Sequence, residues 1–229
     1  ISFIGGGVNN TASQIVGTIG GGCCNSVTAC ASAILGGCCN VVNSNCSSIV
    51  GGACNTSSNC YTFVGGGAKN CSITPHSLVV GGLCNSILVG ECAAIVGGIC
   101  NINCASFGFI GGGCKNLTQG TISFIGGGVC NRTLKATSCI TTISGGMCNC
   151  TNCDFTTIGG GCGNEARNLA STIGGGNCHL NNGCYGTIGG GFCNTIVGTS
   201  STIAGGAANK TSGNLAVVSG GASNCATLG

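Results

Sequence analysis

The stretch ISFIGGGVNN (residues 1–10) decides the fold, because the chain repeats it with small changes from end to end. Residues 17–25 read GTIGGGCCN and residues 32–40 read SAILGGCCN. Counting on the polar residue after the glycines gives fifteen repeats at a spacing of 15 residues. The exceptions are one extra residue near Glu91 and three extra residues near 135–138. So regular a period is typical of stacked repeat proteins.

Within each repeat, numbered so that the Asn is position 10, certain residue types are fixed. Position 4 is always Ile or Val, positions 6 and 7 are always Gly, and position 2 is Ser, Thr, Gly or Ala. Small and β-branched residues that alternate before a glycine pair predict a short strand and a tight corner. Position 8 is mostly small or apolar, which predicts a second inward-facing strand after the corner.

A unit of 15 residues is too short for a helical hairpin and suits one coil of a narrow solenoid, whose strands pair with those of neighbouring coils. The prediction is therefore an all-β fold, a parallel β-solenoid (β-roll or β-helix) of about fifteen 15-residue coils. We expect residues 1–229 to form a single repeat solenoid, either processed or a segment of a longer fibre.

The Asn at position 10 predicts a ladder, because stacked amides can bond to one another and to backbone groups of the corner. The break at His179 is interpreted as a tolerated polar substitute. The expected ladder members are Asn10, Asn25, Asn40, Asn55, Asn70, Asn85, Asn101, Asn116, Asn131, Asn149, Asn164, Asn194, Asn209 and Asn224.

The 24 cysteines allow three interpretations. Disulfides between coils or chains would harden the solenoid, although directly stacked cysteines have parallel Cβ directions that separate them too far. Alternatively, the cysteines fill narrow columns as small apolar residues, or the cluster CNCTNC at 148–153 binds a metal ion without a complete zinc motif. The candidate stacked or disulfide-forming residues, all at position 9, are Cys24, Cys39, Cys54, Cys84, Cys100, Cys130, Cys148, Cys178 and Cys193.

Charge is scarce, since only 4% of the residues are Asp, Glu, Lys or Arg and the net charge is +3. The basic residues are scattered, which argues against a nucleic-acid partner, and no apolar run is long enough to span a membrane. No two acids are close enough for catalysis, and His76 and His179 lie about seven coils apart. We therefore expect no enzyme activity, no cofactor and no metal site.

The units SFIGGGVNN at 2–10, TTIGGGCGN at 156–164 and GTIGGGFCN at 186–194 resemble the head repeats of YadA-like trimeric adhesins. They resemble still more the Ile-Gly-Gly-Gly-x-x-Asn repeats of surface and fibre proteins from giant viruses and phages. The resemblance covers essentially the whole chain. It implies a left-handed parallel β-roll, with a trimer as one form of assembly, that serves attachment or forms a fibre shaft on a surface.

The main functional hypothesis is a non-catalytic structural protein that forms a cysteine-hardened surface fibre, filament or virion-associated assembly. Its partners would be further copies of the chain, associated axially or laterally, and its location extracellular, on a cell surface or on a virion. The alternative is an adhesin-like binding module with a host-surface ligand. A minor form of that alternative is an ice-binding solenoid, suggested by a Thr column at position 3 from Thr142 to Thr202.

Overall fold

The computed structural model describes residues 1–134 and 140–227, so the expected insertion near 135–138 and Cys139 lie outside the described residues. It divides into two compact units, Ile1–Lys115 and Asn116–Gly229. The described residues contain thirty short β-strands and no helix. No described segment therefore forms a helix of the length and apolar character needed to cross a membrane. The expectation of a single domain over 1–229 stays a prediction.

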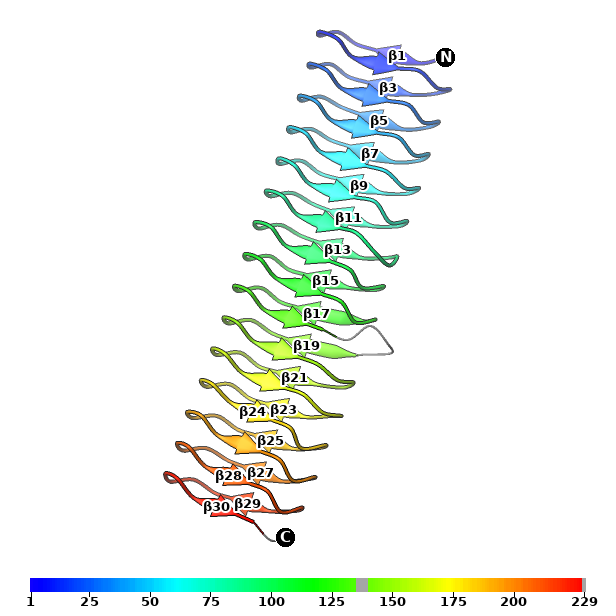
Figure 1. Ribbon diagram of the computed structural model, residues 1–229. Helices are drawn as coiled ribbons and strands as arrows, with labels where there is room; N and C mark the ends of the chain where they lie inside the picture. The colour runs from blue at the N-terminus through cyan, green and yellow to red at the C-terminus, as the bar shows by residue number, and fades with distance from the viewer. Residues whose placement is uncertain (135–139, 228–229) are drawn as a thin grey trace. The chain divides into compact units, whose positions relative to one another are not determined.

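The first unit consists of two parallel sheets whose strands alternate along the chain (Figure 1). One sheet contains β1 (Phe3–Ile4), β3 (Thr18–Ile19), β5 (Ala33–Ile34), β7 (Ser48–Ile49), β9 (Phe63–Val64), β11 (Leu78–Val79), β13 (Ala94–Ile95) and β15 (Phe109–Ile110). The other contains β2 (Thr11–Ala12), β4 (Ser26–Val27), β6 (Val41–Val42), β8 (Thr56–Ser57), β10 (Cys71–Ser72), β12 (Ser86–Ile87) and β14 (Ile102–Asn103).

The second unit repeats this arrangement. Its first sheet contains β17 (Ser123–Ile125), β19 (Thr141–Ile143), β21 (Thr157–Ile158), β23 (Thr172–Ile173), β25 (Thr187–Ile188), β27 (Thr202–Ile203) and β29 (Val217–Val218). Its second sheet contains β16 (Leu117–Thr118), β18 (Arg132–Thr133), β20 (Cys150–Thr151), β22 (Glu165–Ala166), β24 (Leu180–Asn181), β26 (Thr195–Ile196), β28 (Lys210–Thr211) and β30 (Cys225–Ala226).

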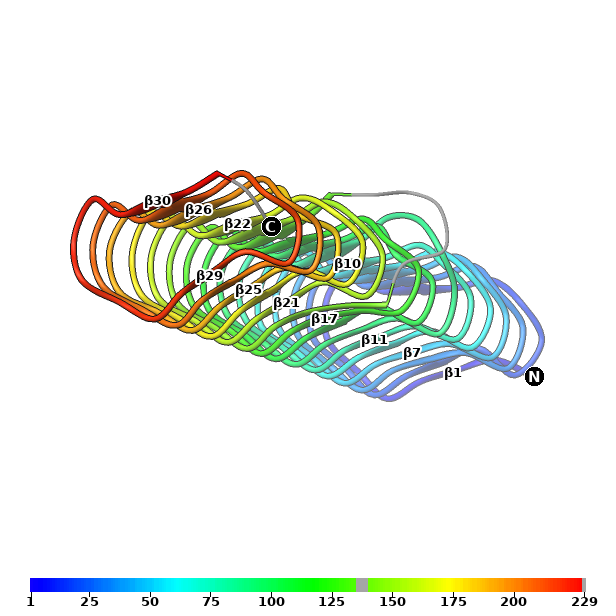
Figure 2. The ribbon, with the colours of Figure 1, turned by 90° about the horizontal axis from the view of Figure 1, so that it is seen from below.

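Each coil contributes one strand to each sheet, and equal positions of successive coils pair in register. Ile19 lies beside Ile34, for example, and Val27 beside Val42. Within each unit the coils follow one another with the same flattened outline (Figure 2). The prediction of an all-β parallel solenoid of about fifteen coils is confirmed.

The core of each coil is only one or two side chains wide. Position 4 supplies a column of Ile and Val, and Ile19, Ile34 and Ile49 have no exposed surface. Positions 10 and 12 of the opposite sheet face the same interior, as the buried Asn25 and Val27 show. A column of β-branched residues fills so narrow a space because their shape packs well between pleated strands.

The prediction for position 8 is wrong, because its side chains point outward. Position 8 forms an isolated bridge to the next coil, as between Leu83 and Ile99, and both of these side chains are exposed. The reason lies at position 9, whose backbone is left-handed, with a φ of 55° at Cys84. This residue interrupts the alternation of sides that an extended strand would keep. Position 8 therefore faces solvent although position 10 is buried.

Non-glycine residues also take the left-handed conformation at position 1, which forms the opposite corner. Val16 and Ile122 are examples, with φ of 60° and 53°. This conformation costs about 1–2 kcal/mol for an ordinary residue. The coil maintains it because the N–H group reaches the preceding coil, as Val16 N–H does at the carbonyl of Ile1 over 3.1 Å.

Glycine is required at position 7 and not at position 6, which allows a matched test in one coil. Gly52 has a φ of +89°, and a Cβ there would overlap the carbonyl oxygen of Gly67 and lie 2.7 Å from Asn55 Nδ2. A Cβ at Gly51 would meet nothing within 4 Å. We expect Gly52→Ala to destabilise the fold by about 3 kcal/mol or more and Gly51→Ala to change it by less than about 1 kcal/mol. Thermal unfolding followed by circular dichroism measures both, and equal midpoints for the two variants would contradict the corner geometry.

Candidate functional site

The Asn residues at position 10 form a buried ladder at the corner that follows the glycines. The Asn40 N–H donates to Oδ1 of Asn25 in the preceding coil over 3.0 Å. Asn40 Nδ2 donates to the carbonyls of Gly36 in its own coil (3.2 Å) and Gly52 in the next (2.9 Å). In parts of the ladder the amides also bond directly, as from Asn40 Nδ2 to Asn25 Oδ1 over 3.1 Å.

The position of the Asn follows from the direction of the backbone. In the strands, N–H groups donate to the following coil, as Thr18 does to Ser32. At positions 9 and 10 the N–H groups point to the preceding coil instead, as Cys24 N–H does toward the carbonyl of Val8. The next N–H, of Asn25, has the side-chain oxygen of Asn10 as its acceptor. Because a buried N–H without an acceptor is costly, each Asn completes the backbone bonding of its neighbour.

The ladder spacing follows the chain through the two insertions. Asn101 N–H reaches Asn85 Oδ1 over 3.0 Å across 16 residues, and Asn149 N–H reaches Asn131 Oδ1 over 3.0 Å across 18 residues. Extra residues are therefore accommodated away from this corner.

His179 occupies the ladder with an imidazole and keeps only part of the bonding. Its N–H donates to Asn164 Oδ1, and its Nδ1 accepts from Asn194 N–H, both over 3.0 Å. The buried Nε2 has no hydrogen-bond partner of normal geometry, although the carbonyl of Gly191 lies nearby. Burial lowers the pKa of His179 from 6.5, and the neighbouring backbone of Gly191 and Asn194 opposes this only in part. The neutral ring therefore carries its hydrogen on Nε2, which an Asn amide would replace with two bonds.

The substitution His179→Asn should raise the stability of the protein by about 1–2 kcal/mol at pH 7, since it restores side-chain bonds to two glycine carbonyls. The advantage should grow below pH 6.5, because the unfolded histidine binds a proton that the buried ring resists. Denaturation curves at several pH values for the parent and the variant measure both effects.

The reciprocal change, Asn164→His, serves as the control and should lower stability and make it more sensitive to acid. If His179→Asn left the stability and its pH dependence unchanged, the ladder would not have the bonding role given to it here.

The cysteines lie on the outside of the solenoid. All 23 described cysteines are free thiols, and each is partly or fully exposed. The interpretation that they fill buried columns is therefore wrong for the described residues. At position 9 the left-handed backbone directs the side chain outward, as at Cys54 (φ 56°) and Cys100 (φ 55°). The predicted position 9 cysteines thus share one exposed edge within each unit.

Four of the thiols gather over two neighbouring coils. The sulfur atoms of Cys23 and Cys24 are 3.3 Å apart, and those of Cys38 and Cys39 are 3.4 Å apart. Cys23 also bridges Cys38 in the next coil. A hydrogen bond with Cys38, together with the charges of neighbouring thiolates, raises the pKa of Cys39 to about 11. The group is therefore protonated at neutral pH.

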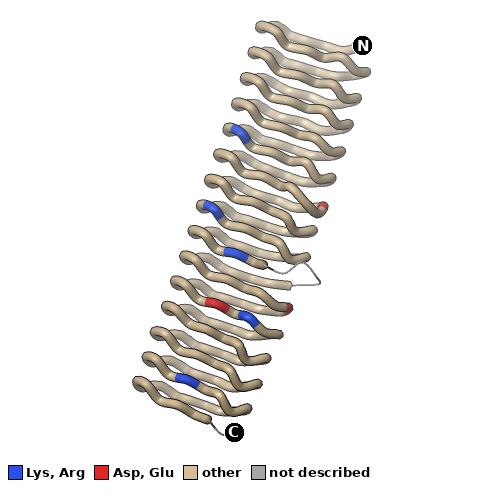
Figure 3. Tube along the Cα trace, viewed as in Figure 1, with Lys and Arg blue, Asp and Glu red and all other residues tan. Residues whose placement is uncertain are grey.

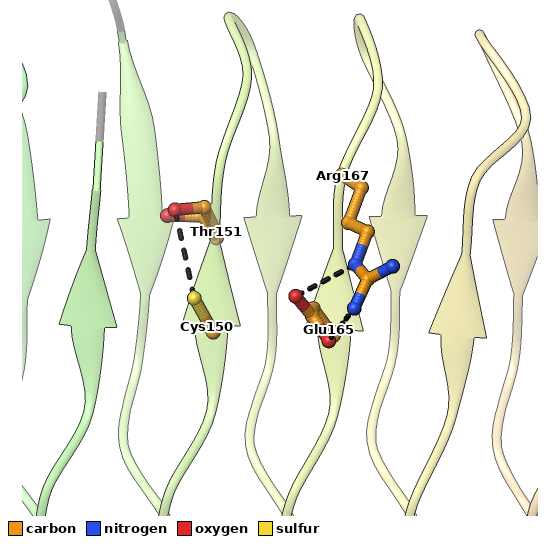
Figure 4. A network of polar contacts seen from close by, with 4 residues as sticks. All are labelled: Cys150, Thr151, Glu165 and Arg167. Atoms are coloured by element: carbon orange, nitrogen blue, oxygen red, sulfur yellow. Dashed lines mark hydrogen bonds and ion pairs between the residues drawn. The ribbon is translucent and has the colours of Figure 1, made fainter. Parts of the chain in front are cut away.

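A second polar group lies on the outer face of the second unit (Figure 4). Arg167 makes a bidentate ion pair with Glu165, with Nε–Oε1 2.7 Å and Nη2–Oε2 2.8 Å. Cys150 lies beside Glu165 in the adjacent strand. Burial, assisted by Glu165, raises the pKa of Cys150 to about 11. A protonated thiol is a poor nucleophile, so this arrangement does not activate the cysteine.

Charged residues are otherwise scattered over both units (Figure 3). Among the described residues, no group of three or more His, Cys, Asp or Glu side chains is placed to hold a metal ion together. The sequence cluster at 148–153 is dispersed by the fold. Cys148 lies at the exposed corner, whereas Cys150 is half-buried on β20.

Sequence reasoning missed an exposed apolar column at position 1, here called the corner column. In the first unit it contains Tyr61, whose ring stacks on His76 at a centroid distance of 5.0 Å. In the second it contains Phe155, Tyr185 and Leu215, which are 57%, 58% and 72% exposed. Position 1 varies among aromatic, aliphatic and small residues, so only its fixed distance from the Asn could have indicated it.

No protein-family model matches the chain, and a search of curated proteins found no match either. The functional argument therefore rests on the residues and their geometry.

Proposed function

We propose that the protein is a non-catalytic structural protein that forms a surface fibre, filament or virion-associated assembly. The observation that carries the proposal is that the bonding within each unit runs along the stack. Every coil joins its neighbours through two parallel sheets, a position 8 bridge and the Asn ladder. Such a one-dimensional network suits a stiff shaft, because each added coil repeats the same contacts.

The outer surface supports association between copies of the chain. The corner column exposes large apolar side chains such as Phe155 and Tyr185, and contiguous exposed apolar patches are typical of interaction sites. The column repeats at the coil spacing of about 4.8 Å. A second copy has the same period and can match it over many coils. Few charges oppose such contact, since charged residues make up 4% of the chain.

Cysteine cross-links would harden this assembly. Directly stacked thiols fit a disulfide poorly, because a coil spacing of about 4.8 Å exceeds the Cβ separation of about 3.5–4.5 Å that a disulfide needs. Cys46 and Cys92 are exposed members of position 1. Links through these residues would join neighbouring chains at the corner column, in the oxidising surroundings of a cell or virion surface.

The test is electron microscopy of native, non-reduced material. We expect long fibres or lateral bundles, and we expect the double variant Phe155→Lys/Tyr185→Lys to lose lateral association while its circular dichroism stays unchanged. Charges facing each other across an apolar contact cost desolvation and repulsion. Ser212→Lys/Asn214→Lys adds the same charge at exposed positions outside the corner column and should still assemble.

Single-chain rods at every concentration would overturn the assembly proposal. Fibres that the corner-column variant forms as readily as the parent would show that lateral contact uses another face.

A second candidate, an ice-binding module, is favoured by one ladder in the second unit. Thr142, Thr157, Thr172, Thr187 and Thr202 follow one another in register at position 3. All five side chains are partly or fully exposed on the outer face of one sheet. Regularly spaced hydroxyl groups on a rigid face could order water at a repeat of about 4.8 Å.

This candidate predicts a measurable thermal hysteresis in dilute solution. It also predicts that Thr172→Lys/Thr187→Lys abolishes the hysteresis, whereas Lys substitutions at Ser212 and Asn214 preserve it. A null result for the parent protein removes the candidate.

A further inference from the structure

The densest thiol group outside any role assigned so far is formed by Cys23, Cys24, Cys38 and Cys39, here called the thiol grid. Two of its edges run within a coil, with sulfur separations of 3.3 Å and 3.4 Å. The other two run between coils, where Cys23 pairs with Cys38 and the Cys39 N–H bonds to the carbonyl of Cys23 over 2.9 Å. All four thiols are partly or fully exposed. Cys54 extends the grid by one coil, where its N–H bonds to the carbonyl of Cys38 over 2.9 Å.

Neither edge of the grid suits a disulfide. Consecutive Cα atoms are about 3.8 Å apart, closer than the separation of about 4.4–6.8 Å usual in disulfides. Between coils, parallel Cβ directions keep the Cβ atoms near the strand spacing of about 4.8 Å, which is too far. The geometry therefore favours thiols that stay separate but close.

The thiols also affect one another's protonation. Neighbouring sulfur groups raise the pKa of Cys23, with Cys24 as the main cause and Cys38 contributing. Cys39 responds to Cys38 first, and also to Cys24 and Cys54. Several thiolates at such distances repel one another, and a bound cation would reverse this effect by neutralising them. The grid is thus poised to exchange protons for a soft cation.

We propose that the thiol grid binds Cu(I), with each ion held linearly between stacked cysteines of neighbouring coils, Cys23 with Cys38 and Cys24 with Cys39. Two metal–sulfur bonds of about 2.3 Å, as in zinc thiolates, span about 4.6 Å in a line, close to the coil spacing of about 4.8 Å. Thiolate sulfur is a soft ligand and selects soft ions such as Cu(I). Each bound ion displaces two thiol protons into solvent, and no electron is transferred.

Two-coordinate binding agrees with the arrangement of the ligands. Among the described residues no three metal-binding side chains are grouped to hold one ion, whereas a structural zinc site needs four. Copper binding also goes beyond a fibre role, because it gives this edge of the solenoid a chemical capacity that the shaft does not require.

The experiment titrates the reduced full chain with Cu(I) under anaerobic conditions against a coloured Cu(I) chelator. The variants are Cys24→Ser/Cys39→Ser, Cys23→Ser/Cys38→Ser and the quadruple variant that combines them. The matched control is Cys71→Ser/Cys225→Ser, because Cys71 pairs with Thr56 and Ser86 and Cys225 pairs with Lys210. Circular dichroism verifies that each variant keeps the fold.

We expect each grid pair to account for about one tightly bound Cu(I), so that the quadruple variant loses about two and the control none. X-ray absorption should show two sulfur neighbours per ion, and proton release should make the affinity rise with pH. Unchanged copper content in the quadruple variant would overturn the proposal. So would four-sulfur coordination, zinc binding as tight as that of Cu(I), or recovery of the four cysteines as disulfides from reduced protein exposed to air.

Discussion

The hydrogen bond from the N–H of each position 10 residue to the side chain below it is the constraint on which the rest of the coil depends. At positions 9 and 10 the backbone N–H groups turn toward the preceding coil, as at Cys39 and Asn40. The second of these N–H groups finds a side-chain oxygen as its acceptor. The same amide holds the carbonyls of positions 6 and 7, as Asn40 does with Gly36 and Gly52. The glycine pair, the left-handed corner and the fixed distance between repeats are thereby parts of one bonding unit.

This unit explains why the surface carries the variation. The interior holds one column of Ile and Val beside small residues, so it tolerates few changes of volume. The outward positions 1, 8 and 9 are free of that restriction, and there the chain carries Tyr61, Phe192, Cys54 and Lys69. Both functional proposals therefore concern edges of the solenoid, where side chains repeat at the coil spacing. An apolar column presents a periodic surface to another copy, and a thiol column presents periodic ligands to a soft ion.

The two edges use the same repetition in different ways. Association along the corner column gains with length, because many weak apolar contacts add up over successive coils. Metal binding needs only two neighbouring coils, because the stacking distance itself sets the separation of the ligands. The cysteines at position 9 are exposed by the left-handed backbone, and the spacing of about 4.8 Å separates them too widely for disulfides and suits linear coordination.

The sequence by itself determined the solenoid, because the 15-residue period and the fixed Ile, Gly and Asn positions are visible without coordinates. It also predicted that the Asn amides would bond to the corner backbone, since a polar residue recurring beside glycines needs a partner. Only the tertiary structure decided which way positions 8 and 9 face. A left-handed residue such as Cys84 shifts the alternation of sides, and Cys, Lys and Gly all occur at position 9, so residue type did not reveal it. The thiol grid and the corner column likewise required the structure, because their members are about 15 residues apart in sequence and become neighbours only when the coils stack.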